Sequence, residues 1–230
     1  MKKYTTILFD ADDTLLDFGK DETNALTMIL QKYGIETSDE NIKAYKEINV
    51  SLWKALERGE IDKPTLKRTR FSLFFEKIGF NTQEDHYKIN EEYLYNLGNG
   101  GNLMDGAREL AEKLKDEGYD LYIVTNGIEN TQKRRLTKAG ILPLFTDIFV
   151  SETIGHQKPK KEYFDYVLSH IKEKDISKVL LVGDSLTSDI KGATDSGITC
   201  AWLRHDESTD YSAYRPDFII DDISQLNTLL

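Results

Sequence analysis

Short apolar runs rich in β-branched residues recur along the chain and predict buried strands. Such runs lack the polar alternation of half-exposed strands, and they are typical of parallel strands covered on both faces. The predicted strands span residues 4–9, 121–125, 147–151, 179–183, 198–203 and 217–220. From residue 105 onward they alternate with helical patterns that end at Gly118, Gly140 and Gly197. This alternation predicts an α/β fold with a doubly wound parallel sheet.

A run of helical patterns interrupts this alternation after the first strand. Apolar residues at helical spacing, with no strand pattern between them, occupy residues 22–34, 41–59, 65–79 and 84–98. They predict an all-α domain at 17–98, inserted into a sheet domain made of 1–16 and 99–230. The glycine-rich stretch "GNGGNLMDG" is the expected return linker and hinge.

The charge balance restricts the class of partner. The chain has 230 residues, 40 of them acidic and 30 basic, which gives a formal net charge of −10. Binding to a nucleic acid polymer or an anionic membrane works through a basic surface, so neither is expected here. The expected partner is a small molecule or a cation, and the expected assembly is a monomer or a homodimer.

Cysteine usage and apolar run length indicate the compartment. The single cysteine, Cys200, excludes an intramolecular disulfide framework and a zinc site built on several thiolates, and we expect it to be a buried thiol. The apolar run at the N-terminus is too short for a signal peptide, and no stretch approaches the roughly 20 apolar residues of a membrane span. We therefore expect a cytoplasmic location.

Polar side chains follow the predicted strands at the edge where open parallel sheets bind ligands. In chain order these side chains are Asp10 and Asp12, Thr125 and Asn126, Lys158, and Asp184 and Asp189. If the strands are neighbours, these groups converge.

The residue types at this edge suit phosphoryl chemistry. Asp10 and Asp184 supply the hard oxygen ligands that Mg²⁺ prefers, and a cation would relieve the repulsion between them. A carboxylate beside Mg²⁺ can attack phosphorus to give an aspartyl-phosphate. A second carboxyl two residues along, Asp12, could protonate the leaving oxygen and then take a proton from water. Lysine, threonine and backbone N–H groups would neutralise the phosphoryl oxygens.

Four of these segments together resemble a known family. "DADDT", "VTN", Lys158 and "GDSLTSD" are similar, in this order, to the four motifs of the haloacid dehalogenase (HAD) superfamily, and the helical insert lies where that superfamily carries its cap. The resemblance covers essentially the whole chain, and it implies a Rossmann-like core with a helical cap.

The resemblance also implies roles for the residues at the motif positions. Asp10 would be the nucleophile and Asp12 the general acid and base, while Thr14 helps to fix the loop. Phosphate would be bound by Thr125, Asn126 and Lys158. Mg²⁺ would be held by the Asp10 side chain, the Asp12 backbone carbonyl and Asp184, with Asp189 as a ligand, a water holder or an orienter of Lys158.

One departure from the commonest motif narrows the expected substrate. The family usually has glycine before the threonine, whereas this chain has Asp13, as in the variant that resembles cytoplasmic pyrimidine 5′-nucleotidases. The resemblance therefore implies a Mg²⁺-dependent phosphomonoesterase that acts on a small phosphate ester. The expected substrate is a pyrimidine or noncanonical nucleoside monophosphate.

Three alternatives remain open on the sequence. A phosphoglycolate or sugar-phosphate phosphatase shares every core motif, and the cap would decide between it and a nucleotidase. A 2-haloacid dehalogenase would use the same aspartate on carbon, but its family pattern lacks the second aspartate, so Asp12 disfavours it. A phospho-accepting signalling module of the receiver type combines similar groups, but the large insert and the Asp-x-Asp pair disfavour it.

Several conspicuous residues have a simpler interpretation. Asp13, Asp17 and Asp21 are expected to be cap or surface groups. Ser185 is expected to cap a helix, and His156 to be exposed.

The aromatic residues of the insert are expected to form its core. These residues are Trp53, Phe71, Phe74, Phe75, Tyr93 and Tyr95. In the nucleotidase hypothesis one aromatic of the insert stacks on the base, and Arg68 or Arg70 binds a distal group of the substrate.

Overall fold

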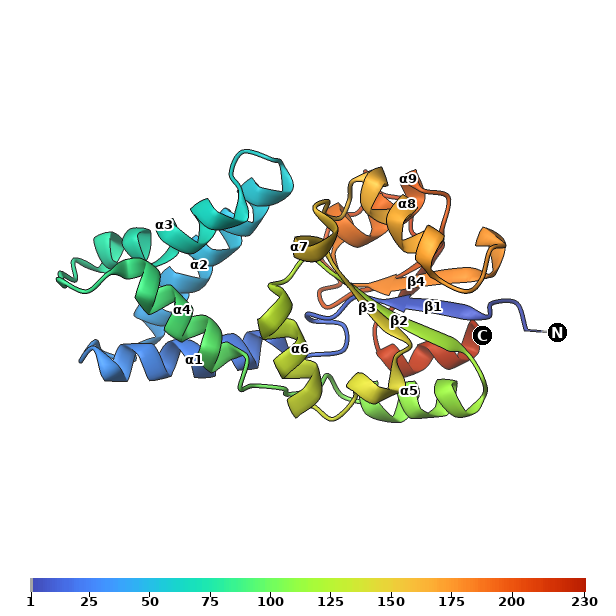
Figure 1. The fold of residues 1–230 in the computed structure, drawn as a ribbon, viewed down its shortest axis with the longest axis horizontal. Coiled ribbons are helices and arrows are strands. Elements are labelled where there is room, and N and C mark those ends of the chain that lie inside the picture. Colours follow the sequence, from blue (N-terminus) through green and yellow to red (C-terminus); the bar gives the residue numbers. More distant parts are fainter. Residues whose placement is uncertain (1) are drawn as a thin grey trace. The chain divides into compact units, whose positions relative to one another are not determined.

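The computed structural model describes residues 2–230, which divide into two compact units (Figure 1). The first unit contains the chain up to Phe18 and from Gly101 to Leu230, and the second runs from Gly19 to Gly100. The chain passes from one unit to the other after Phe18 and after Gly100, in each case two residues later than the sequence pattern predicts. Within the described residues, no helix has both the length and the apolar character needed to cross a membrane.

The first unit is built on a parallel sheet with the strand order β3-β2-β1-β4-β5-β6. Its strands are β1 (Thr6–Phe9), β2 (Asp120–Thr125), β3 (Asp147–Val150), β4 (Val179–Gly183), β5 (Thr199–Leu203) and β6 (Phe218–Ile220). The chain starts in the middle at β1, adds β2 and β3 on one side, and then crosses to add β4 on the other. The predicted doubly wound α/β fold is therefore confirmed.

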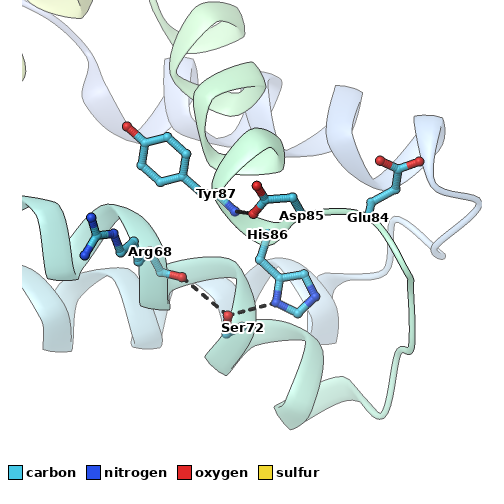
Figure 2. A pocket seen from close by; sticks show the side chains of 6 residues that line it. All are labelled: Arg68, Ser72, Glu84, Asp85, His86 and Tyr87. Atoms are coloured by element: carbon cyan, nitrogen blue, oxygen red, sulfur yellow. Dashed lines mark hydrogen bonds between the residues drawn. The ribbon is translucent and has the colours of Figure 1, made fainter.

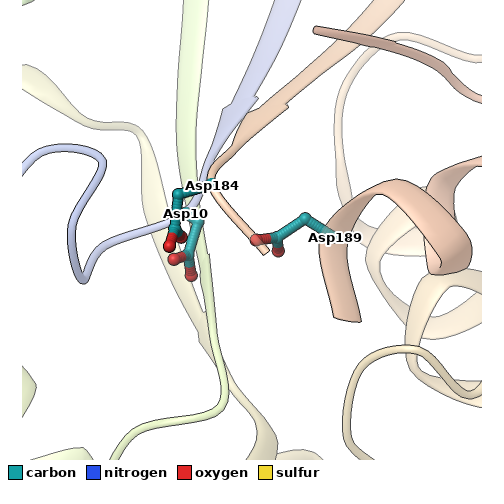
Figure 3. Close-up of side chains that lie close together, drawn as sticks. All are labelled: Asp10, Asp184 and Asp189. Carbon is teal, nitrogen blue, oxygen red and sulfur yellow. The ribbon is translucent and has the colours of Figure 1, made fainter. Parts of the chain in front are cut away.

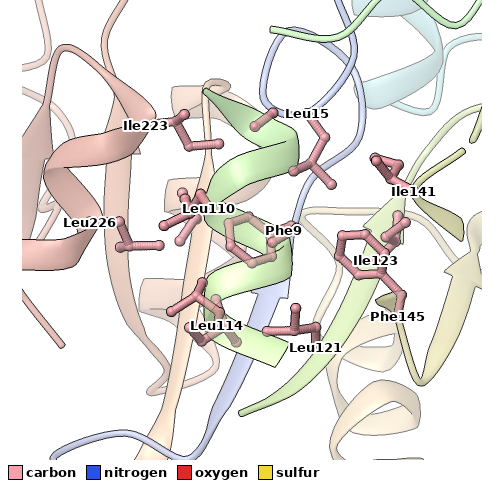
Figure 4. Close-up of a cluster of buried hydrophobic side chains, with 14 of the residues drawn as sticks. Phe9, Leu15, Leu110, Leu114, Leu121, Ile123, Ile141, Phe145, Ile223 and Leu226 are labelled. Carbon is pink, nitrogen blue, oxygen red and sulfur yellow. The ribbon is translucent and has the colours of Figure 1, made fainter. Parts of the chain in front are cut away.

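Alternate residues of the strands face two separate apolar clusters. Ile7 and Phe9 of β1 belong to one cluster, which Leu110 of α5 (Ala107–Asp116) and Leu226 of η4 (Ile223–Thr228) complete. Figure 4 shows Phe9, Leu110 and Leu226 in this cluster. Leu8 points into the opposite cluster. Because both faces are covered, nearly every strand residue is buried, which explains the continuous apolar runs in the sequence.

Helices cover each face of the sheet. One face carries α5 (Ala107–Asp116), α6 (Glu129–Lys138), η1 (Leu142–Leu144) and η4 (Ile223–Thr228). The other carries α8 (Lys161–His170) and α9 (Lys191–Asp195), with Cys200 of β5 buried beneath them as a free thiol, as predicted. The remaining short elements are α7 (Ser151–Ile154), η2 (Ile176–Lys178) and the π-helical turn η3 (Leu186–Ile190).

The second unit consists of helices with well-defined ends. They are α1, which starts at the boundary (Phe18–Lys32), α2 (Asp39–Glu57), α3 (Lys63–Ile78) and α4 (His86–Leu97). Side-chain oxygens of Ser38, Asp62 and Asp85 accept hydrogen bonds from backbone N–H groups at the starts of α2, α3 and α4. Helix α3 ends at Gly79, whose φ of 66° is the left-handed conformation that glycine adopts without strain.

Most of the predicted aromatic residues form the interior of this helical unit. Phe71, Phe74 and Tyr93 are buried and pack around Tyr45 in tilted or edge-on pairs, and the buried Phe75 packs against Phe71 and Phe74. Trp53 is half-buried beside a smaller apolar cluster.

Two predictions about individual residues of α1 and α4 are wrong. Tyr95 is 59% exposed, because residues two apart point to different sides of a helix and Tyr93 takes the inner position. Asp21 is only 1% exposed in the first turn of α1, since it shares the inward face with Ala25 and Ile29. Its carboxylate packs so closely against Gly100 that a Cβ there would lie 2.4 Å from Asp21 Cγ.

Candidate active site

Three carboxylates meet at the carboxyl ends of adjacent central strands. Asp10 directly follows β1, Asp184 directly follows β4, and Asp189 projects from η3 (Figure 3). One carboxylate oxygen of each lies within 4.8 Å of the others. The Asp10 amide donates to Val182 O at 2.9 Å, so Asp10 continues the ladder between β1 and β4. The cluster therefore lies where the strand order reverses, the usual ligand site of such sheets.

A buried ammonium group connects two of these carboxylates. Lys158 is 1% exposed, and its Nζ donates to Asp10 Oδ1 at 2.5 Å, to Asp189 Oδ1 at 2.6 Å and to Val124 O at 2.9 Å. An ammonium has three hydrogens, and these three acceptors use them all. A buried charge is tolerated only when it is paired in this way, so Lys158 and the carboxylates depend on one another.

The cluster carries more negative than positive charge. Burial, together with the neighbouring Asp189 and Asp12 carboxylates, raises the pKa of Asp10 to about 8 although Lys158 acts against the rise. Burial and the Asp10 and Asp189 charges also raise the pKa of Asp184 well above its usual range. Burial alone would lower the pKa of Lys158, but Asp10 and Asp189 raise it above its ordinary value. Lys158 thus stays protonated while the Asp10 and Asp184 carboxyl groups resist ionisation.

The donor set fits a hard divalent cation. Three carboxylates and one ammonium would leave two uncompensated negative charges if every group were ionised. Carboxylate oxygens are the ligands that Mg²⁺ prefers. The residues present thus match the charge and the chemistry of a magnesium site.

Asp189 is anchored more firmly than its neighbours. Its side chain is fully buried, with Oδ1 bonded to Lys158 and Oδ2 accepting from the Ser185 N–H at 3.1 Å. A Cβ on Gly183 would lie 2.5 Å from Asp189 Cγ, so this approach requires glycine. Ser185 caps η3 by accepting from Ser188 N, as predicted. Asp189 is therefore held as a partner of Lys158.

The residues after β2 also converge on this edge. Thr125 Oγ1 accepts from Gly127 N and from Gln132 Nε2, each at 3.0 Å. Asn126 exchanges two hydrogen bonds of 2.9 Å with the backbone of Lys158, which holds the lysine segment in place. The side-chain amide of Asn126 is thus occupied with Lys158, while the Thr125 hydroxyl hydrogen remains available to another acceptor.

Two residues that the sequence interpretation missed hold Asp12. Gln132 Nε2 donates to Asp12 Oδ2 at 2.7 Å, and Arg135 Nη1 donates to Asp12 Oδ1. Both residues are on α6. Gln132 and Arg135 each lie four positions before a buried apolar residue, Leu136 and Ala139, so all four share one helix face. This spacing is the sequence signal that could have indicated that they are buried.

The loop after β1 is held chiefly by its backbone. Leu15 N and Leu16 N both donate to Ala11 O, and Asp13 N donates to Leu16 O. Asp13 has a φ of 54°, a left-handed conformation that glycine, the usual residue at this motif position, adopts without strain. Its Oδ1 accepts a hydrogen bond from Phe18 N at 3.1 Å. Asp13 therefore caps α1, as predicted. Thr14 is buried, and its hydroxyl has no hydrogen-bond partner among the residues that the structure describes. His156 is exposed, as expected.

Comparison with known proteins decides the family. Residues 4–197 match the family model of the haloacid dehalogenase-like hydrolases. The chain belongs to this family.

The relatives span nearly the full chain. YfnB of Bacillus subtilis (strain 168) is 39% identical over 100% of this chain and 97% of its own. The pyrimidine 5′-nucleotidase PynA of Streptococcus pneumoniae is 36% identical over 94% of this chain and 90% of its own. The pyrimidine 5′-nucleotidase YjjG of Escherichia coli is 29% identical over 99% and 98%.

A crystal structure of YfnB superimposes closely on this chain. The TM-score is 0.93, over 100% of this chain and 99% of YfnB. That crystal structure is bound to magnesium and reveals interdomain movement. The predicted family is thus confirmed, and so is the predicted enzyme class of a phosphoric monoester hydrolase.

The raised pKa of Asp10 predicts how magnesium stabilises the fold at different pH values. Without metal, the folded chain keeps a proton on Asp10 between about pH 4 and pH 8 that the unfolded chain releases, so stability falls as pH rises through this window. A cation must displace that proton. We expect the rise in melting temperature caused by Mg²⁺, relative to chelator, to be larger at pH 8 than at pH 6.

Thermal unfolding of the unchanged protein and of Asp10→Asn, at both pH values with Mg²⁺ and with chelator, checks this. The variant should lose most of the Mg²⁺ effect at pH 8. A magnesium effect equal at both pH values would contradict the assignment of these carboxylates to the cation.

The left-handed backbone at Asp13 predicts unequal effects of two substitutions. Glycine adopts this φ without strain, whereas a β-branched side chain clashes with its own backbone. We expect Asp13→Val to have a free energy of unfolding about 1–2 kcal/mol below that of Asp13→Gly. Urea unfolding measures both, and equal stability of the two variants would show that the backbone conformation does not constrain this position.

Proposed function

We propose that this protein is a Mg²⁺-dependent phosphomonoesterase that works through an aspartyl-phosphate on Asp10. The observation that carries the proposal is the buried pairing of Asp10 with Lys158 beside a second carboxylate, Asp12, that is held separately by Arg135. One carboxylate is thereby positioned as a nucleophile and the other as a proton carrier. This division of roles is what two-step phosphate ester hydrolysis requires.

Asp10, Asp12, Lys158 and Thr125 would have different roles in the two steps of hydrolysis. Asp10 attacks phosphorus, and Asp12 gives a proton to the departing ester oxygen. Asp12 then takes a proton from the water that attacks the phosphoryl group, which releases phosphate and restores Asp10. When Asp10 turns to phosphorus, it releases the Lys158 hydrogen that its Oδ1 accepted. Lys158 and the Thr125 hydroxyl then donate to phosphoryl oxygens, where negative charge is stabilised in a site that largely excludes water.

Asp10, Asp184 and the Asp12 carbonyl are the proposed ligands of Mg²⁺, with Asp189 in support. When bound, the cation neutralises phosphoryl charge and holds the phosphate beside Asp10. The magnesium in the YfnB crystal structure and the charge of the carboxylate cluster support this assignment.

The substrate that we propose is a nucleoside 5′-monophosphate, with a pyrimidine or noncanonical base. PynA and YjjG, which are pyrimidine 5′-nucleotidases, support this choice because they match this chain over at least 94% of its length. The proposal also gives the helical unit the role of a cap that admits substrate and excludes water. The interdomain movement of YfnB supports that role.

The helical unit has polar groups that suit recognition of a base. Side-chain atoms of Asn49, Arg70 and Asn90 find no hydrogen-bond partner within residues 2–230, although each residue is at most 2% exposed. Arg68 instead lines an open surface pocket of about 730 Å³ with Ser72 and His86, whose Oγ and Nδ1 are 2.8 Å apart (Figure 2). Of the two arginines considered, Arg70 is therefore the better candidate for a distal group of the substrate.

Phosphate release tests the function directly. The purified protein should release phosphate from nucleoside monophosphates with Mg²⁺ and stop when a chelator is added. Phosphoglycolate, sugar phosphates and 2-haloacids complete the panel. We expect preference for pyrimidine monophosphates and loss of turnover in Asp10→Asn, with the fold retained.

Preference for another phosphate ester would overturn the proposed substrate and keep the mechanism. Halide release from 2-haloacids, or substantial turnover by Asp10→Asn, would overturn the mechanism.

The proton-carrier role of Asp12 predicts a dependence on the leaving group. A nucleoside alkoxide needs a proton as it departs, whereas nitrophenolate does not. Asp12→Asn should therefore lower kcat for a nucleoside monophosphate by about 10²–10⁴ and impair nitrophenyl phosphate much less in the first chemical step. Single-turnover rates with both substrates measure this. Equal losses would contradict the role of Asp12 as acid.

A further inference from the structure

Helix α6 buries two polar side chains against the proposed active site. Gln132 is 2% exposed and Arg135 is fully buried, and they lie three positions apart on one face of the helix. Burying a guanidinium and an amide costs free energy unless both are paired. The pairing partners of these two side chains are groups to which the proposed function assigns chemistry.

The two side chains fix the orientation of the Asp12 carboxylate. Arg135 Nη1 donates to Asp12 Oδ1, and Gln132 Nε2 donates to Asp12 Oδ2 at 2.7 Å. Because different donors bind the two oxygens, the carboxylate plane cannot rotate freely. Each oxygen has two lone pairs, so one remains on each for the proton that is transferred.

Arg135 also sets the orientation of the Gln132 amide. Gln132 Oε1 accepts from Arg135 Nη1 at 3.1 Å, so the amide nitrogen faces the carboxylate. A flipped amide would place its oxygen against Asp12 and its nitrogen against the guanidinium, two contacts between like groups. The two residues therefore act as a unit.

The same amide reaches the proposed phosphate site. Gln132 Nε2 donates to Thr125 Oγ1 at 3.0 Å, and Gly127 N donates to the same oxygen at 3.0 Å. With both acceptor positions used, the hydroxyl hydrogen of Thr125 must point to another acceptor, and a phosphoryl oxygen would serve.

The surroundings are shaped to accept these side chains. A Cβ on Gly127 would lie 2.6 Å from Gln132 Cγ, so the seat of Gln132 requires glycine at that position. The Arg135 guanidinium carbon lies 5.6 Å from the centre of the Phe18 ring, within range of a cation–π contact. These contacts limit the alternative positions of both side chains.

We propose that Gln132 and Arg135 are positioning residues: Arg135 aims the Asp12 carboxylate, and Gln132 couples it to the Thr125 hydroxyl. This proposal rests on the proposed function, since it takes Asp12 as proton carrier and Thr125 as phosphate donor. Neither residue is assigned a contact with the reacting atoms.

The two residues should have separable kinetic signatures. Arg135 bonds Asp12 directly and acts on Thr125 through Gln132. Arg135→Met should therefore lower kcat for a nucleoside monophosphate up to about 100-fold, raise KM less than Gln132→Met does and affect nitrophenyl phosphate less. Gln132 contacts both Asp12 and Thr125, so Gln132→Met should lower kcat and raise KM for both substrates. Arg135→Lys keeps a cationic donor and should recover part of the loss.

A double-mutant cycle supplies the decisive readout. In an Asp12→Asn background the proton carrier that Arg135 orients is already lost, so adding Arg135→Met should change the nucleoside monophosphate rate less than about twofold. Lys133→Met, an exposed position on the same helix, is the matched control and should behave like the unchanged protein. Melting temperatures establish which variants are folded, and Gln132→Met and Arg135→Lys serve if Arg135→Met is not.

The outcomes separate the two proposals. If the unchanged protein shows no magnesium-dependent phosphate release, the proposed function fails. If that activity is present but folded Arg135→Met loses both substrates equally or loses as much again in the Asp12→Asn background, or if folded Gln132→Met leaves KM unchanged, Gln132 and Arg135 are only structural and this inference fails.

Discussion

The buried ammonium of Lys158 between Asp10 and Asp189 is the interaction on which the site depends. It uses all three of its hydrogens, with distances of 2.5–2.9 Å to acceptors after β1, in η3 and at Val124 of β2. Without it, the Asp10, Asp184 and Asp189 carboxylates would repel one another within a few ångströms. With it, burial and the charges of the neighbouring carboxylates still raise the pKa of Asp10 and Asp184. A divalent cation would relieve that repulsion, which is why it fits here.

The sheet tolerates this cluster because the charged side chains lie at one edge, beyond the ends of the buried strands. Strands β1 and β4 are buried along their length and contain no charged side chain, and Asp10 and Asp184 come directly after their last residues. Helices on both faces cover the strands with apolar side chains and exclude water from them. Helix α6 then contributes a separate polar pair, so that Asp12 is bound by Arg135 while Asp10 is bound by Lys158. Two nearby carboxylates thereby have different cationic partners.

The sequence predicts the parts of the structure that follow from periodicity. Strands buried on both faces leave continuous apolar runs, and parallel strands place their ends together, so the convergence of Asp10, Thr125, Lys158 and Asp184 could be foreseen. Gln132 and Arg135 could not be recognised by residue type, because polar residues in a helix usually face water. Asp21 is likewise buried, although its residue type predicts a cap or surface position. Asn126 pairs with the backbone of Lys158, a contact that only the fold creates. Tyr95 is exposed rather than buried, and its spacing of two residues from Tyr93 already argues against a shared helix face.

The most direct test of the central claim is to trap the covalent intermediate on Asp10. The enzyme would be mixed with Mg²⁺ and a nucleoside monophosphate, quenched rapidly and reduced with borohydride, which converts an aspartyl-phosphate to homoserine. Peptide mass spectrometry then reads residue 10. An aspartyl-phosphate on Asp10 predicts homoserine at position 10 only when substrate is present. Unmodified Asp10 in protein that is releasing phosphate rapidly, or label at another residue, would contradict it.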